Sequence, residues 1–473
     1  MLSIKNCGIL LLAGSCFIYC CKKTKQSPAP PVVVPSSDKS ITAFNFKAAN
    51  NTGYLIDDAV GVIGTDSVKI TVPAETDISR LKPEILFTGK TITPATALDQ
   101  NFTSPLNYTI TAADGSTKKY VVSITFRTTV FICSLGGIMY ALDGMNGQEI
   151  WKSTTEKFYS GSPSVYKGIV YICGIDGLYA LDAGTGVEKW KMPIISNTAT
   201  SEFLPSPVTA DNTVYFSASD GFVYALNTGD GSLKWKTPST TGMSFSSNVT
   251  LNSNTLFTGC KDSSLYAIHL SDGTINWKFK MGDAIVKNPL VVNNWVYTAG
   301  RNGSYYMLNG ATGSVIWKGN NDFHVSSPTY DNGVIYCGGG TRGSGNDFTT
   351  GARLWSLYEL GPGGTINNER SSAEIRNGVY YAGSNNGTVC AYNINTNAKI
   401  WSLTTSGNFV FASPVIAEGM LFIGAFTQKF YAIDILTGAI KWSINTKGGI
   451  MGSACVIDQA GIKHYPGNSG EKN

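Results

Sequence analysis

The stretch YALDAGTGVEKWK, residues 179–191, decides the fold because close copies of it recur along most of the chain. YALDGMNGQEIWK begins at residue 140, YALNTGDGSLKWK at 224 and YAIDILTGAIKWS at 431. Each copy reads as an apolar strand, a glycine-containing bend and a second strand that carries a tryptophan. Self-similarity at a period of about forty residues predicts a repeat architecture.

Eight units can be aligned on the first residue of the YAL-like triplet. These residues are Tyr140, Tyr179, Tyr224, Tyr266, Tyr306, Trp355, Cys390 and Tyr431. In seven units a tryptophan follows eleven residues later: Trp151, Trp190, Trp235, Trp277, Trp317, Trp401 and Trp442. We assign these seven a structural role, because a large flat ring can wedge between neighbouring sheets. Trp355 is interpreted as the exception that occupies the tyrosine position of its unit.

Residues 160–191 give the clearest single unit. SGSPSV, GIVYICG, GLYALDA and VEKWK predict four antiparallel strands, with Asp182 bonded to the amides of its own turn and Gly186 in a conformation that side chains oppose. Such a sheet is apolar on both faces and needs neighbours, so closure into a ring is expected. Residues 449–458, GIMGSACVID, copy a first strand that the first unit lacks, and we expect them to close the ring.

The pattern A-L-D-x-x-T-G-x-x-x-W resembles the repeat of the pyrroloquinoline quinone (PQQ)-like propeller family. It is present as ALDAGTGVEKW and nearly so as MLNGATGSVIW and AIDILTGAIKW. The resemblance implies an all-β fold, with an eight-bladed β-propeller over residues 128–465. Some members of the family are calcium-dependent quinoprotein dehydrogenases. Others, such as the propeller lipoprotein of the outer-membrane β-barrel assembly machine, are docking scaffolds without a cofactor.

Quinone chemistry would need a Ca²⁺ site with carboxylate ligands and an Asp that acts as base. Many enzymes of the family also stack the quinone on a disulfide between adjacent cysteines, and the only adjacent pair here is Cys20–Cys21, outside the propeller. His269, His324 and His464 have no metal-ligand spacing. We therefore predict no cofactor, no metal and no catalytic residue, while convergence of carboxylates from different blades remains an alternative.

The first residues predict export. An apolar run, GILLLAGSCFIY, follows Lys5, and residues 1–21 read as a lipoprotein signal peptide. Cys21 is the predicted lipidation site and Cys16 its rival, and an ordinary cleaved signal peptide is the other alternative. Residues 22–38 form a proline-rich tether. The positive charge after the cysteine favours the periplasmic side of the outer membrane over surface display.

Residues 39–127 form a separate block of alternating strands that ends in a hairpin with an Asp114–Gly115 turn, and we predict an immunoglobulin-like β-sandwich. This block resembles small modules at the N-terminus of bacterial surface lipoproteins. Residues 466–473 are expected to be a disordered tail. Lys5, Lys22, Lys23 and Lys25 account for the net charge of +4, so the rest of the chain implies no nucleic-acid partner.

The sixth unit departs from the pattern. Residues 338–353 read as a long replacement for the turn between its second and third strands, and its fourth strand is replaced by residues 361–370. Strand parity places both on one face, opposite the N-terminal domain. We hypothesise a patch for a partner or ligand there, and the alternative is a drifted loop. The patch comprises Arg342, Asn346, Asp347, Arg353, Asn367, Asn368, Glu369 and Arg370, with Asp322 and His324 beside them.

Three functions fit these features. The first is a non-catalytic cell-envelope lipoprotein, bound to the outer membrane by its lipid, whose propeller is a scaffold for envelope protein partners. The second is a surface carbohydrate-binding protein, which would show exposed aromatic side chains around one mouth of the propeller. The third is a quinoprotein dehydrogenase that depends on PQQ and Ca²⁺.

Overall fold

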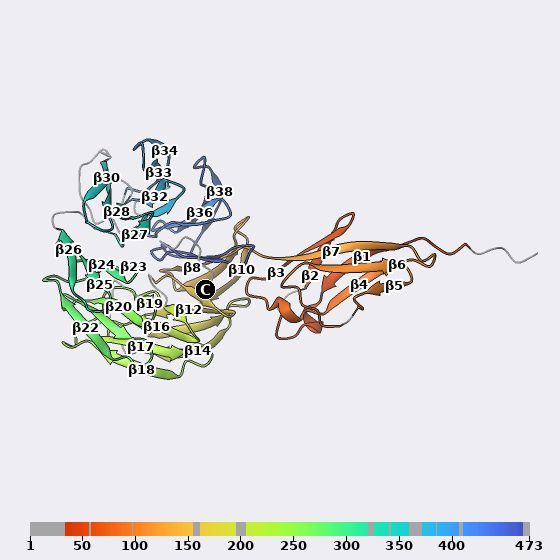
Figure 1. The fold of residues 1–473 in the computed structure, drawn as a ribbon, viewed down its shortest axis with the longest axis horizontal. Helices are drawn as coiled ribbons and strands as arrows, with labels where there is room; N and C mark the ends of the chain where they lie inside the picture. Colours follow the sequence, from red (N-terminus) through yellow and green to blue (C-terminus); the bar gives the residue numbers. More distant parts are fainter. Residues whose placement is uncertain are drawn as a thin grey trace, which may run out of the picture.

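The computed structural model describes residues 34–55, 58–96, 98–154, 161–194, 205–319, 326–339, 342–358, 371–384, 386–405 and 410–466. They form a small β-sandwich followed by an eight-bladed β-propeller (Figure 1). Two short 3₁₀ helices, η1 (Ala48–Asn50) and η2 (Ile78–Arg80), lie in the sandwich. None of the described helices has the length and apolar character of a transmembrane span.

The β-sandwich is built from seven strands. They are β1 (Ser40–Phe46), β2 (Ala59–Ile63), β3 (Ser67–Val72), β4 (Pro83–Thr88), β5 (Thr91–Thr93), β6 (Leu106–Thr111) and β7 (Thr117–Phe126). They are hydrogen-bonded in the order β4-β1-β2-β3-β7-β6-β5, and β3 and β7 are parallel. Alternate residues of the strands point inward into one core, where the rings of Phe44 and Tyr108 meet edge to face at 5.2 Å. The predicted small sandwich domain is confirmed.

Blades two to eight each contain four consecutive antiparallel strands. Blade two is β11 (Ser164–Tyr166), β12 (Ile169–Gly174), β13 (Gly177–Asp182) and β14 (Glu188–Pro193). Blade three is β15 (Val208–Ala210), β16 (Thr213–Ser217), β17 (Phe222–Asn227) and β18 (Leu233–Pro238). Blade four is β19 (Thr250–Asn252), β20 (Thr255–Cys260), β21 (Ser264–His269) and β22 (Ile275–Lys280). Blade five is β23 (Leu290–Val292), β24 (Trp295–Ala299), β25 (Tyr305–Asn309) and β26 (Val315–Gly319).

The remaining three of these blades follow in the same way. Blade six is β27 (Thr329–Asp331), β28 (Val334–Gly339), β29 (Arg342–Asp347) and β30 (Arg353–Tyr358). Blade seven is β31 (Glu374–Arg376), β32 (Val379–Gly383), β33 (Thr388–Asn393) and β34 (Lys399–Thr404). Blade eight is β35 (Val415–Ala417), β36 (Met420–Ala425), β37 (Lys429–Asp434) and β38 (Ile440–Asn445).

Blade one combines strands from both ends of the propeller. It contains β8 (Thr129–Ser134), β9 (Ile138–Asp143), β10 (Glu149–Thr154), β39 (Cys455–Ile457) and β40 (Lys463–His464). The strand order is β10-β9-β8-β39-β40, and β39 is antiparallel to β8. The segment expected to close the ring therefore does so. The additional strand β40 lies on the inner side of β39, next to the propeller axis.

The seven aligned tryptophans each join their own blade to the following one. Every one of them donates its indole N–H to a backbone carbonyl in the bend between strands three and four of the following blade, at 2.8–3.1 Å. The indole also covers the glycine of that bend. A Cβ atom on Gly186, for example, would lie 2.4 Å from the ring of Trp151. These contacts support a structural role for the tryptophans.

The interpretation of blade six is wrong in its details. The residues expected to form a long loop contain the regular strand β29, and Gly345 pairs with Trp355 as Ala180 pairs with Trp190. Trp355 thus lies eleven residues after Ser344 and is the eighth blade tryptophan. The third strand escaped notice because Arg342–Asp347 has the sequence RGSGND, which offers no apolar alternation.

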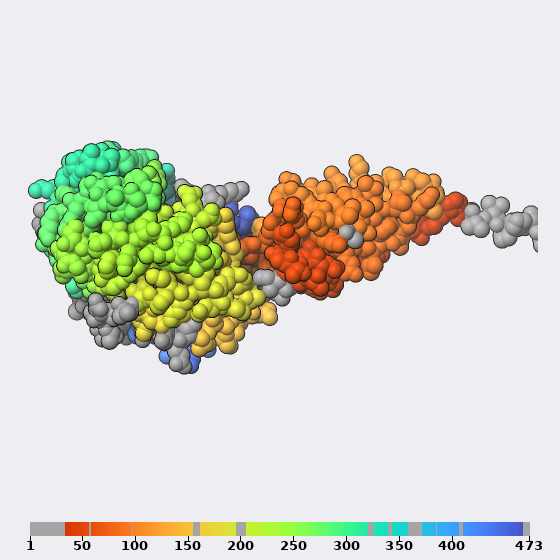
Figure 2. Space-filling view, turned by 90° about the horizontal axis from the view of Figure 1, so that it is seen from below, coloured from red at the N-terminus to blue at the C-terminus, as the bar shows by residue number. Residues whose placement is uncertain are grey.

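The propeller has two distinct faces. The near face carries the turns between strands one and two and the bends between strands three and four. The far face carries the remaining connections. The sandwich sits on the near face, as strand parity predicts, because the carbonyl of Thr128 accepts from Gly144 and the carboxylate of Glu75 accepts from Gly168. Figure 2 shows the two domains as separate masses joined at a narrow waist.

Candidate interaction surfaces

The described residues do not assemble the predicted patch. Asp322, His324, Asn367, Asn368, Glu369 and Arg370 lie outside the described residues, as do the predicted lipidation site Cys21 and its rival Cys16. Asn346 is 1% exposed and takes the place of the leucine in the YAL triplet; its amide donates to the hydroxyl of Tyr305 at 3.3 Å. Because this side chain is buried between blades five and six, it is not available to a partner.

Asp347 and Arg353 flank the bend of blade six. The Asp347 carboxylate accepts hydrogen bonds from the backbone and hydroxyl groups of Thr349 and Thr350, which lower its pKa. Asp434 caps the equivalent bend of blade eight in the same way. Asp347 therefore belongs to the repeated architecture. Arg353 is exposed at the start of β30, and Arg342 begins β29 by pairing with Gly339.

Far-face turns in blades two to four share a polar cluster. In blade two the hydroxyl of Tyr179 donates to Asp176 at 2.6 Å, and Lys191 lies 2.6 Å from the same carboxylate. In blade four Asp262 accepts from Tyr266 at 2.7 Å and pairs with Lys278 at 3.0 Å. These contacts tie strands three and four to the turn before strand three, so they brace the outer part of the blade.

The pKa values of the blade-four cluster follow from these contacts. Burial alone would raise the pKa of Asp262, but the hydrogen bonds from Tyr266 and Lys278 outweigh it and lower the pKa below its ordinary value. Burial is also the largest influence on Tyr266 and raises its pKa. At neutral pH the cluster is therefore an ionised carboxylate held by a neutral phenol and a lysine ammonium group, which is a stable arrangement rather than a poised acid–base pair.

Polar side chains form a girdle around the axis just before the first strand of each blade. Seven backbone amides donate at 2.8–3.1 Å to the side chain at the same position of another blade. The donor and acceptor residues are Ser162 to Ser206, Ser206 to Asn248, Asn248 to Asn288, Asn288 to Ser327, Ser372 to Ser413, Ser413 to Ser453 and Ser453 to Ser162. The eighth link, between Ser327 and Ser372, is not made.

A quinone and Ca²⁺ site would need several converging carboxylate ligands. No group of three or more His, Cys, Asp and Glu side chains that could hold a metal occurs within the described ranges. None of the six described cysteines forms a disulfide, and all six are buried; burial raises the pKa of the Cys260 thiol to about 11, which disfavours the reactive thiolate. His464 is bonded to Asp458 at 2.8 Å, and His269 to Asn254 at 2.8 Å.

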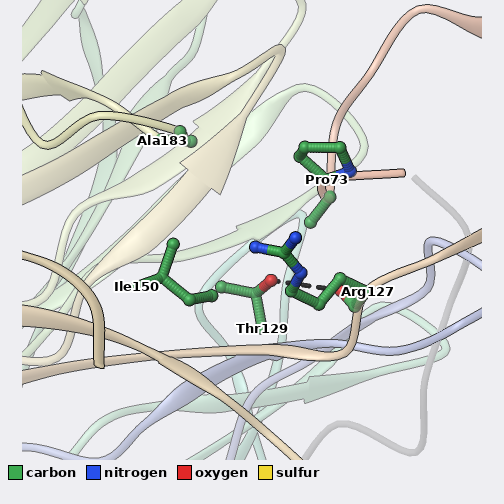
Figure 3. A pocket seen from close by; sticks show the side chains of 7 residues that line it. Pro73, Arg127, Thr129, Ile150 and Ala183 are labelled. Carbon is green, nitrogen blue, oxygen red and sulfur yellow. Dashed lines mark hydrogen bonds between the residues drawn. The ribbon is translucent and has the colours of Figure 1, made fainter. Parts of the chain in front are cut away.

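The domain junction lies over blades one and two. Pro73 and Ala74, in the loop after β3, line a small pocket with Arg127, Ile150 and Ala183 (Figure 3). The pocket has room for little more than a water molecule, so it is a packing gap. Glu75 follows in the same loop; it accepts from the Gly168 amide at 3.1 Å and pairs with Lys463 of β40 at 3.1 Å.

Exposed aliphatic side chains gather on the outer bends and fourth strands of several blades. Leu354 is 59% exposed in blade six, Ile400 is 46% exposed in blade seven, and Leu436 and Ile440 are 77% and 46% exposed in blade eight. This surface was not among the predicted sites. An alignment on the tryptophans would have revealed part of it, because the residue before the tryptophan is aliphatic in blades six and seven and lysine in blades two and three.

Two family models match the chain. The model described as "Outer membrane protein assembly factor BamB" matches residues 135–280 and 261–460, and the model described as "SGBP, N-terminal" matches residues 41–124. Among curated proteins, the serine/threonine-protein kinase AfsK of Streptomyces griseus is 33% identical over 98 residues, which is 20% of this chain. The match spans only 12% of the kinase.

Several solved structures resemble this one. BamB from Moraxella catarrhalis aligns with a TM-score of 0.51 and 18% identity over 66% of this chain and 89% of its own. The computationally designed Ika8 protein aligns with a TM-score of 0.51 and 16% identity, over 66% and 96%. A europium-containing methanol dehydrogenase aligns with a TM-score of only 0.42 and 16% identity, over 69% and 80%. Because the BamB model covers most of the chain, the protein belongs to the PQQ-like propeller family described by the outer membrane protein assembly factor BamB.

Proposed function

We propose that this protein is a non-catalytic cell-envelope lipoprotein whose propeller is a scaffold for protein contacts. The observation that carries the proposal is that the repeated side chains hold the blades together. The tryptophans, the girdle and the turn-capping carboxylates all join blades or brace them, so the repeat builds a rigid disc. The family match to an outer-membrane assembly factor supports a role in protein contact.

In this proposal a lipid on Cys21, with Cys16 as the alternative, anchors the chain to the outer membrane. The tether of residues 22–38 and the sandwich then hold the propeller away from the lipid surface. Because the sandwich covers only part of the near face, the far face and the rest of the near face are left for partners. Metabolic labelling with a radioactive fatty acid tests the anchor: Cys21→Ala should abolish the label, and Cys16→Ala should retain it.

Crosslinking in intact host cells, followed by mass spectrometry, tests the scaffold. The expected result is the recovery of the same envelope protein in repeated experiments, crosslinked to propeller residues. Recovery only of proteins in proportion to their abundance would contradict the proposal. Addition of PQQ and Ca²⁺ should produce no dye reduction with alcohols or sugars, whereas turnover would establish the dehydrogenase alternative instead.

A second candidate, carbohydrate binding, has one observation in its favour. Phe411 and Phe426 lie in far-face connections of blade eight with ring centroids 5.8 Å apart, and Phe426 is 42% exposed. An exposed aromatic ring near a propeller mouth can stack on a sugar. Retarded migration in gels that contain cell-surface polysaccharide, lost in Phe426→Ala, would favour this function over the scaffold.

A further inference from the structure

The sandwich already occupies one groove of the near face, and the contact shows what such a groove accepts. Ala74 and Ile150 both pack against the core that contains Trp151 and Ala183. Ile150 directly precedes Trp151, and Ala183 begins the bend of blade two. Beside this apolar contact, the amide of Gly168, in the turn between strands one and two, donates to the Glu75 carboxylate. The groove thus holds a short apolar–acidic loop, Pro73–Ala74–Glu75.

Blades seven and eight repeat this groove. Trp401 pairs with Ala391 as Trp151 pairs with Ala141, with a bulge at the same place in both blades. The indole N–H of Trp401 donates to the carbonyl of Ile435 at 2.9 Å. The indole N–H of Trp151 donates to the carbonyl of Ala183 at the same distance.

Three positions therefore correspond. Ile400 takes the place of Ile150, Ile435 and Leu436 take the place of Ala183 and Gly184, and Gly419 takes the place of Gly168. The two turn glycines have φ values of 71° and 72°. The backbone of the groove between blades seven and eight is thus built like the one that the sandwich fills.

This second groove is uncovered and more apolar than the first. Ile400 is 46% exposed and Leu436 is 77% exposed, and Ile440 continues the apolar surface along blade eight. In the part of the chain that the structure describes, the Gly419 amide has no hydrogen-bond acceptor. The equivalent groove between blades three and four carries Lys234 and Ser271 at the positions of Ile400 and Leu436. Polar residues are tolerated at these positions, so the aliphatic ones point to a contact.

We propose that the groove formed by Ile400, Ile435, Leu436 and the Gly419 amide binds an apolar–acidic loop of a partner protein, in the manner of Pro73–Ala74–Glu75. The apolar residue of that loop covers the aliphatic side chains, and its carboxylate accepts from the Gly419 amide. The groove is continuous with the established domain contact, because Glu418, next to Gly419, accepts from the amide of Gln459 in the C-terminal hairpin that also contacts the sandwich. This inference rests on the proposed scaffold function and names its surface.

A photo-crosslinking amino acid at position 436 of the full-length protein, expressed in its host cells, tests the proposal. Position 271, the polar equivalent in blade four, is the control. We expect a partner protein crosslinked from 436 and absent from 271, with the crosslinked peptide placing the contact in a loop that joins small apolar residues to Asp or Glu. Ile400→Lys should lower the yield from 436 at least tenfold, whereas Asn276→Lys, at the matching position of blade four, should leave it unchanged.

The outcomes separate this inference from the scaffold function. Partner capture from far-face positions but not from 436 would overturn the groove and leave the scaffold in place. Crosslinks from 436 to a second copy of this chain, or to a lipid, would overturn the assignment of the partner. An absence of specific capture from every surface position would overturn both. Thermal unfolding of each variant establishes that a lost crosslink does not come from a lost fold.

Discussion

Glu75 of the sandwich lies 3.1 Å from Lys463 of β40, and only 14% and 16% of the two side chains are exposed. The pair joins the N-terminal domain to the strand that flanks the ring closure. Because removal of one partner leaves a charge largely buried and unpaired, Glu75→Gln should destabilise the protein by about 1–3 kcal/mol, less than the loss expected in a dry core. The free energy of unfolding in urea measures this effect.

The exposed pair of Lys47 and Asp58 is the control for this prediction. It has a shorter distance, 2.8 Å, but its side chains are 40% and 48% exposed. Asp58→Asn should therefore destabilise the protein much less than Glu75→Gln. Equal effects of the two substitutions would show that the Glu75–Lys463 pair does not couple the domains.

Replacement by phenylalanine should lower the stability of the protein at Trp401 but not at Trp355. The indole N–H of Trp401 donates to Ile435 at 2.9 Å, and Trp401→Phe should cost about 0.5–1.5 kcal/mol beyond the change in packing. The indole N–H of Trp355 is buried and has no hydrogen-bond partner among the described residues, so Trp355→Phe removes an unsatisfied donor and should be neutral or stabilising. Urea titrations of both variants check this, and a larger loss for Trp355→Phe would contradict it.

Asn397 explains the different orientation of Trp355. In the other blades the bend position next to the indole is glycine, and a Cβ on Gly438 would lie 2.7 Å from the ring of Trp401. Blade seven has Asn397 there, with a φ of 57°, so its side chain excludes the ring. Trp355 instead packs against Tyr380 at 5.1 Å, in space left by Gly343.

Backbone amide hydrogens at the contact between blades six and seven should exchange faster with solvent than those at the contact between blades seven and eight. Within the described residues, the contact between blades six and seven lacks the tryptophan hydrogen bond and the girdle link from Ser327 to Ser372, whereas the contact between blades seven and eight has both. Hydrogen exchange detected by mass spectrometry should therefore show lower protection for β31 than for β35. Equal protection of the two strands would mean that these ties contribute little to the local stability.

Asp262 gives the protein a defined pH dependence. Its folded-state pKa lies below the ordinary value of 3.8, so its contribution to stability is fully present above that value and is lost as the pH falls through the lower folded value. The pKa of Lys278 is raised above 10.5, so its contribution is present below 10.5 and is lost as the pH rises through the higher folded value. Asp262→Asn should therefore destabilise the protein between about pH 4 and pH 10.

Denaturant titrations over this range measure the difference between Asp262→Asn and the unaltered protein. The difference should shrink below pH 4, where the native carboxylate becomes protonated. Asp66, exposed between β2 and β3 of the sandwich, is the control, and Asp66→Asn should change the stability much less than Asp262→Asn. A difference for Asp262→Asn that does not depend on pH would contradict the assignment of an ionised carboxylate.

The repeat was predictable because tryptophan and the glycine bend leave a strong sequence signal. The spacing of Trp151 and Trp190 identifies neighbouring blades, and the copy of a first strand at residues 449–458 predicts the pairing of β39 with β8. Blade six was misread because Gly343 and Gly345 leave room for a ring, which is a property of three-dimensional packing. The eleven-residue spacing from Ser344 to Trp355 was the available clue.

The interaction surface was not predictable by the same reasoning. The patch around Arg342 was predicted from loops of unusual composition. The aliphatic groove is formed by Ile400 in the regular strand β34 and by Leu436 in a bend of ordinary length. Its significance depends on exposure and on the equivalent position at Ile150 being covered by Ala74. Neither fact can be read from residue types alone.

The pairing of β39 with β8 sets the order of events during synthesis. The outer three strands of blade one emerge from the ribosome more than three hundred residues before the two inner ones, so the disc stays open until β39 has been made. A chain that stops before Cys455 leaves an uncovered sheet edge, a substrate for chaperones and proteases. Closure of the ring therefore depends on synthesis of the propeller through β39.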